Sequence, residues 1–104
     1  MGRAENQLQN ACLEFLRLRG VMAWRNNTGA VKVGKKQYIR YGHPGSGDIF
    51  AIPFGTFLSI ECKVRGNSAT PIQREWMQAV IDAGGHALVA RTIDDVADAL
   101  EAIE

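Results

Sequence analysis

The chain has 104 residues, of which 46% are hydrophobic and 22% charged, and its formal net charge is +1. These values fit a single ordinary globular domain, residues 1–104, and exclude collagen-like, coiled-coil and disordered chains. No apolar run reaches the roughly 18 residues that a membrane span needs, and the N-terminus lacks the pattern of a signal peptide. Because Cys12 and Cys62 are too few for a disulfide framework and no segment is typical of a membrane span, we expect a cytoplasmic protein with no membrane partner.

Taken in chain order, the first half of the sequence predicts one helix followed by strands. Hydrophobic periodicity indicates an amphipathic helix over residues 3–19, whose apolar arc includes Leu18. Residues 21–27 favour a strand. Residues 30–41 alternate on either side of a glycine–lysine turn, which is typical of a hairpin, here a basic one. Residues 42–47 are rich in glycine and indicate a loop.

The second half predicts two further strands, a helix, a strand and a helix. The apolar runs over residues 48–53 and 56–64 favour the two strands. Residues 71–83 form the next predicted helix, residues 86–91 a short strand, and the last helix ends at Ile103. This order of elements predicts an α/β (α+β) fold with a mixed central sheet flanked by helices.

Three ionisable residues converge on the two apolar strands. If the segment between these strands is a hairpin turn, opposite residues have numbers that add to 109, so Asp48 faces Glu61. Lys63 lies on the same face, two residues after Glu61. Two close carboxylates repel each other unless a cation lies between them, and oxygen ligands favour Mg²⁺ or Mn²⁺. The alternative is a strand-end aspartate beside an edge Glu–Lys pair, and a one-residue shift in register would separate the carboxylates.

These residues also belong to a series of short blocks that covers nearly the whole chain. In order, the blocks are residues 5–9, 16–20 (LRLRG), 24–29 (WRNNTG), 45–49 (GSGDI), 60–63 (IECK) and 70–73 (TPIQ). The series resembles the VRR-NUC family of virus-type replication and repair nucleases, within the PD-(D/E)XK nuclease superfamily. The chain departs from the motif that names the superfamily because Gly47 stands where proline is usual, which leaves the geometry of this loop open.

The resemblance implies a restriction-endonuclease-like αβββαβ core and a role for each residue of the central motif. Asp48 and Glu61 correspond to the carboxylates that bind the catalytic metal ion. The main-chain carbonyl of Cys62 corresponds to a further metal ligand. Lys63 corresponds to the lysine that positions the attacking water and stabilises the transition state.

The resemblance adds Glu5 and Gln73 to the catalytic residues, with Glu5 reaching the metal directly or through a water. Glu5 lies inside the apolar arc of the first predicted helix, where a carboxylate needs a partner such as a metal ion. The alternative is a solvated glutamate that interacts with the helix dipole. For Gln73 the alternative to a place in the site is a capping hydrogen bond at the start of its helix.

Basic residues are concentrated in the first three quarters of the chain. Residues 1–74 contain 11 Lys and Arg and 4 Asp and Glu, whereas residues 75–104 contain 1 and 7. This asymmetry favours a polyanionic partner, although a solvated acidic face on the last two helices would explain it equally well. The candidates for contact with DNA phosphates are the glycine-rich loop and Arg25, Lys32, Lys35, Lys36, Arg40, Ser46 and Arg65.

The sequence therefore predicts a Mg²⁺-dependent deoxyribonuclease that hydrolyses phosphodiester bonds, with Mn²⁺ as a substitute. The resemblance implies a small standalone enzyme of DNA repair or recombination, bacterial or from a phage. It further implies a homodimer that resolves Holliday (four-way) junctions in branched DNA. The alternatives are a nicking or restriction-type nuclease, a catalytically silent DNA-binding module, and an unrelated small α/β protein.

Overall fold

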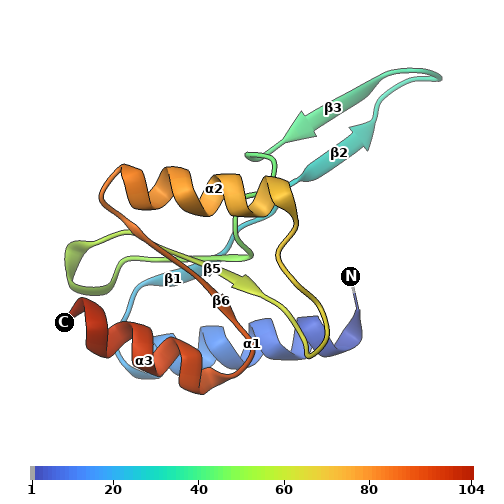
Figure 1. The fold of residues 1–104 in the computed structure, drawn as a ribbon. Coiled ribbons are helices and arrows are strands. Elements are labelled where there is room, and N and C mark those ends of the chain that lie inside the picture. The colour runs from blue at the N-terminus through green and yellow to red at the C-terminus, as the bar shows by residue number, and fades with distance from the viewer. Residues whose placement is uncertain (1) are drawn as a thin grey trace.

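The computed structural model describes residues 2–104, which form three α-helices, six β-strands and one 3₁₀ turn (Figure 1). In chain order these are α1 (Arg3–Leu18), β1 (Ala23–Arg25), β2 (Gly29–Lys32), β3 (Tyr38–Tyr41), β4 (Ile49–Ala51), η1 (Pro53–Gly55), β5 (Leu58–Cys62), α2 (Pro71–Asp82), β6 (His86–Ala90) and α3 (Ile93–Ile103). This order confirms the predicted mixed α/β fold.

The main sheet has four strands in the order β1-β4-β5-β6. The β1–β4 and β4–β5 pairs are antiparallel, whereas β5 and β6 are parallel. In the β4–β5 ladder Ile49 pairs with Ile60 and Ala51 with Leu58, so the predicted register is confirmed. Helix α2 covers one face of the sheet, and α1 and α3 cover the other (Figure 1).

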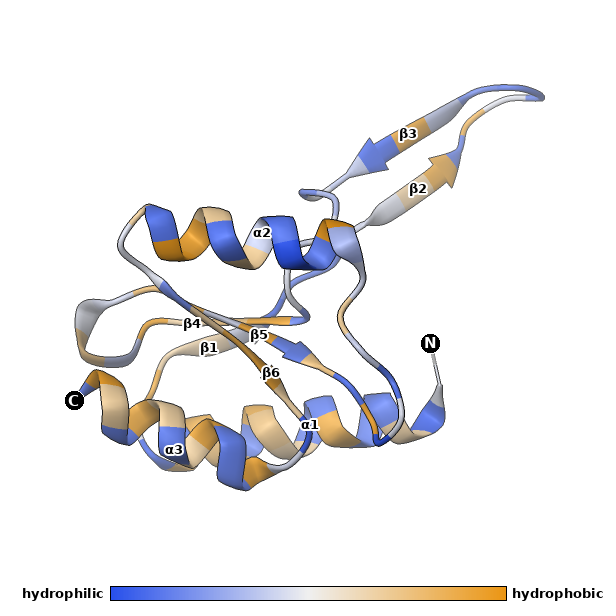
Figure 2. Cartoon of the chain, viewed as in Figure 1, coloured by the Kyte–Doolittle hydropathy of each residue, from blue (hydrophilic) through white to orange (hydrophobic). Residues whose placement is uncertain are grey.

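The core lies between the main sheet and helices α1 and α3, where Cys12 and Cys62 are buried as free thiols. Figure 2 shows polar and apolar residues alternating along each helix, as expected for helices with one buried face. Leu18, predicted within the apolar arc of α1, is instead 78% exposed and stands at the last residue of the helix. Within residues 2–104, no helix is long and apolar enough to cross a membrane.

Strands β2 and β3 form a separate two-stranded sheet that projects from the body of the domain (Figure 1). This confirms the hairpin predicted for residues 30–41. Every residue of both strands is exposed. The projection accounts for the elongated shape of the molecule, whose principal extents are 49 × 31 × 26 Å.

Candidate active site

Asp48 immediately precedes β4 and is fixed to β5 by two hydrogen bonds. Its backbone N–H donates to the carbonyl of Ile60 at 2.8 Å. Its carboxylate Oδ2 accepts a hydrogen bond from the backbone N–H of Cys62, also at 2.8 Å. The backbone of β5 therefore holds the Asp48 carboxylate beside the end of that strand, next to Glu61.

Glu61 is a buried carboxylate with one satisfied and one unsatisfied oxygen. Its side chain belongs to β5, the residue is only 4% exposed, and Oε1 accepts a hydrogen bond from Nε2 of Gln73 at 3.0 Å. Oε2 is buried and has no hydrogen-bond partner among the described residues. Burial, and then the negative charge of Asp48, raise the pKa of Glu61 to about 8. Burial also raises the pKa of Asp48, against the hydrogen bond from Cys62.

These two carboxylates fit a divalent cation. An unpaired buried carboxylate oxygen is costly, and two adjacent carboxylates with raised pKa values repel each other when both are charged. A cation between them would remove both penalties, and hard oxygen ligands suit Mg²⁺ or Mn²⁺. Glu61 Oε2 has no partner within residues 2–104, and either a proton shared with Asp48 or a bound cation would supply one.

Lys63 and Gln73 both act on the carboxylate pair. Lys63 is half-buried, and its positive charge lowers the pKa of Asp48 and of Glu61, opposing the effect of burial. Gln73 makes both of the contacts considered for it, the helix cap and the contact with the site. Its Oε1 accepts a hydrogen bond from the N–H of Thr70 at 2.9 Å, which caps α2, while its Nε2 donates to Glu61. The cap therefore fixes the amide that orients the Glu61 carboxylate.

Glu5 lies in the first turn of α1, near the carboxylate pair. Its Oε2 accepts a hydrogen bond from Nδ2 of Asn67 at 3.2 Å, and its charge contributes to the raised pKa values of Asp48 and Glu61. Within residues 2–104, no three His, Cys, Asp and Glu side chains form a group that could hold a metal ion.

The glycines of the loop before β4 pack against the protein. A Cβ at Gly47 would collide with Oγ of Ser59 and lie 2.9 Å from the carbonyl oxygen of Ile60. A Cβ at Gly45 would lie 2.5 Å from the carbonyl oxygen of Ile72. These two glycines therefore have a packing role inside the protein. The same contacts explain why position 47 has no side chain.

Replacing Gly47 by alanine is expected to destabilise the protein by about 1–3 kcal/mol, since the added methyl group must displace β5 backbone or Ser59. The displacement would also move Asp48, so nuclease activity should fall. Urea unfolding measures the first effect. Gly34→Ala is the matched control, because its Cβ would meet only Gln37, at 3.6 Å. Equal stability of the two variants would contradict the packing role of Gly47.

Ser46 and Arg25, both predicted to contact DNA, have partners within the protein. Ser46 is 8% exposed, and its hydroxyl accepts a hydrogen bond from Nδ2 of Asn26 at 2.7 Å. The guanidinium of Arg25 donates to the side-chain oxygens of Gln9 and Asn10 on α1. These contacts assign both residues to holding the loop and strand β1 in place.

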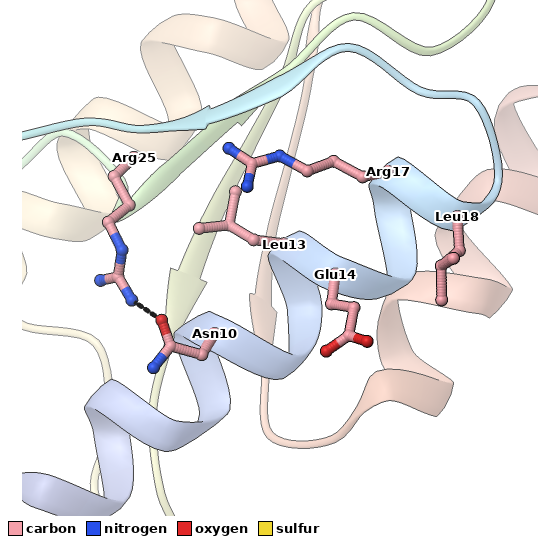
Figure 3. A pocket seen from close by; sticks show the side chains of 6 residues that line it. All are labelled: Asn10, Leu13, Glu14, Arg17, Leu18 and Arg25. Atoms are coloured by element: carbon pink, nitrogen blue, oxygen red, sulfur yellow. Dashed lines mark hydrogen bonds between the residues drawn. The ribbon is translucent and has the colours of Figure 1, made fainter.

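Figure 3 shows the surroundings of Arg25 on the outer side of α1 and β1. A cavity of about 610 Å³ lies there and is lined by Asn10, Leu13, Glu14, Arg17, Leu18 and Arg25. The carboxylate pair does not line this cavity. The remaining predicted DNA contacts are exposed: Lys32, Lys35, Lys36 and Arg40 lie along the β2–β3 hairpin, and Arg65 follows β5.

Sequence reasoning missed the amide side chains that support the site. Nδ2 of Asn26 also donates to the carbonyl of Gly47 at 2.9 Å, which ties β1 to the loop before Asp48. Asn67 holds Glu5, as described above. Asn26 stands within the block 24–29, and its place in that block could have indicated a role near the site. No comparable feature of the sequence marks Asn67.

The comparisons with known proteins concern the fold. No protein-family model matches the sequence, and no curated protein matches it. Among solved structures, the chain is similar to one described as a VRR_NUC domain, with a TM-score of 0.71 and 18% sequence identity. The similarity covers 96% of this chain and 97% of that chain. The chain therefore has the fold of a VRR-NUC domain, as the order of its sequence blocks predicted.

Proposed function

We propose that the chain is a metal-dependent deoxyribonuclease of the PD-(D/E)XK type whose active site consists of Asp48, Glu61 and Lys63. The observation that carries this proposal is the buried, unpartnered Oε2 of Glu61 beside the Asp48 carboxylate. A DNA-binding module without catalysis would have no use for this costly pair. The fold supports the proposal, since it is that of a nuclease domain.

Each residue of the site has a distinct task in hydrolysis. The Cys62 N–H and the Gln73 amide hold one oxygen of Asp48 and one of Glu61, which leaves Glu61 Oε2 free to bind a cation. A divalent cation there would supply Lewis acidity at the phosphate and lower the pKa of a water. Lys63 orients the attacking water and stabilises the negative charge that develops on the phosphate. The Cys62 carbonyl is a further proposed ligand.

Branched DNA, cut by a homodimer, is the substrate that we propose. A two-fold dimer would present two active sites to the two strands of a branched substrate. The exposed basic residues of the β2–β3 hairpin supply phosphate contacts that do not depend on sequence.

Cleavage of an end-labelled four-way junction and a matched linear duplex tests the proposal. In Mg²⁺ or Mn²⁺ we expect paired cuts near the branch, and no cuts in EDTA or with Asp48→Asn. Equal cleavage of the linear duplex would retain the nuclease and reject the preference for junctions. Salt-sensitive binding without cleavage in any metal would reject the nuclease and favour a silent DNA-binding module.

A further inference from the structure

The β2–β3 hairpin has two chemically different faces. Val31 pairs with Ile39 and Gly29 with Tyr41, so these four residues share one face. A Cβ at Gly29 would collide with the Tyr41 side chain, which shows that the tyrosine ring covers this glycine. The opposite face carries Lys32 and Arg40 together with Ala30 and Tyr38, and the turn adds two lysines. The positive charge of the hairpin therefore lies on the face opposite Val31 and Ile39 and at the turn.

The apolar face is exposed to solvent along its length. Val31 is 51% exposed, Ile39 58% and Tyr41 46%. A two-stranded sheet is marginally stable in water unless one of its faces packs against something. In Figure 1 the hairpin stands clear of the three helices that cover the main sheet. We therefore infer that the apolar face packs against a partner.

The charge around the hairpin identifies the class of partner. The hairpin, residues 29–41, contains four Lys and Arg and no Asp or Glu. A hairpin with this charge attracts a polyanion, and nucleic acid is the polyanion that a nuclease fold implies. A second copy that approached hairpin to hairpin would bring two positive surfaces together, and these would repel each other. Charge complementarity therefore favours DNA over a second copy as the occupant of this face.

DNA offers an apolar surface only where base stacking is interrupted. In a continuous duplex the faces of the base pairs are covered by their neighbours, and the outside presents phosphates and base edges. At a branch point, the last base pair of an arm can expose its face. Apolar side chains of DNA-binding proteins pack against such faces and keep base steps unstacked.

We propose that the β2–β3 hairpin recognises the branch point itself, with Val31, Ile39 and Tyr41 packed on the exposed face of the terminal base pair. Lys32 and Arg40, on the opposite face, contact the phosphates of the neighbouring arm. A branched substrate presents both an exposed base-pair face and phosphates to the β2–β3 hairpin, whereas a continuous duplex presents only the phosphates. This inference rests on the proposed nuclease function and names the residues that select the substrate.

Binding in EDTA tests this role without catalysis. The probes are a four-way junction and a linear duplex, all of whose ends are closed by loops so that no terminal base pair is exposed. Val31→Thr/Ile39→Thr keeps β-branched residues and should weaken junction binding about tenfold while changing duplex binding by less than about twofold. The matched variant Lys32→Gln/Arg40→Gln should weaken junction binding and duplex binding by the same factor. The salt dependence of binding should fall by the amount expected for the loss of about two phosphate contacts.

A third variant covers the case in which the threonine pair disturbs the hairpin. Ile39→Trp keeps the face apolar, so the preference for junctions should be retained. The fluorescence of the introduced tryptophan, measured as the difference from the wild type, should be quenched by the junction and not by the closed duplex. Unchanged junction preference in the threonine pair would overturn the proposal. A variant that no longer self-associates but keeps its preference for junctions would also overturn it, because the apolar face would then bind a second copy of the chain. Cleavage by the wild type in Mg²⁺ tests the proposed function separately.

Discussion

Replacing Glu61 by glutamine should make the metal-free protein more stable at pH 8 and remove its nuclease activity. The pKa of Glu61 is about 8 in the folded protein, compared with an ordinary value of 4.5. The folded state therefore binds this proton more tightly than the unfolded chain does. The stability that the protonated carboxyl confers is complete below about pH 4.5 and is lost as the pH rises through 8. Full deprotonation costs on the order of 5 kcal/mol, which glutamine avoids.

Urea unfolding between pH 5 and 9 in EDTA measures this effect. The stabilities of wild type and Glu61→Gln should be similar at the acid end and diverge as the pH rises. Mg²⁺ should restore the wild type and leave the variant unchanged, because a cation takes the place of the proton. Glu14→Gln, an exposed position on α1, is the control and should follow the wild type. Parallel curves for wild type and Glu61→Gln would contradict the assigned electrostatics.

Replacing Lys63 by alanine should lower the rate of cleavage by a factor of about 100–1000 while leaving metal binding intact. Lys63 is proposed to orient the attacking water and to stabilise the charge that develops on the phosphate. Metal binding should not depend on it, because the carboxylates hold the cation. Single-turnover cleavage under saturating enzyme separates this loss from weaker DNA binding. Arg65→Ala, at an exposed position two residues further along, should retain the wild-type single-turnover rate. A variant that cleaves at the wild-type rate would exclude Lys63 from the reaction.

The centre of the site was predictable because it depends on local geometry. A short turn between two apolar strands fixes their register, and the register brings Asp48 to Glu61, as the β4–β5 ladder bears out. The order of helices and strands follows in the same way from periodicity and from turn residues. The capping role of Gln73 was also visible, since Thr70 stands three residues before it.

The parts that could not be predicted depend on contacts between distant segments. The sequence does not show that Gly47 lies against Ile60, or that the Gln73 amide reaches Glu61 from across the fold. Arg25 is an arginine in a basic part of the chain and so is a typical candidate for a phosphate contact. The tertiary structure instead places it against the side-chain amides of Gln9 and Asn10 on α1. In each case the partner is known only once the sheet and the helices are assembled.

Titration of the metal-free protein with Mn²⁺, followed by calorimetry, tests the metal site most directly. The wild type should bind Mn²⁺ with an affinity that rises with pH up to about 8, because the ion displaces the proton of Glu61. Lys63→Ala should bind equally well, and Glu61→Gln should lose binding. Equal binding by Glu61→Gln, or no binding by the wild type at pH 8, would contradict a metal site at Asp48 and Glu61.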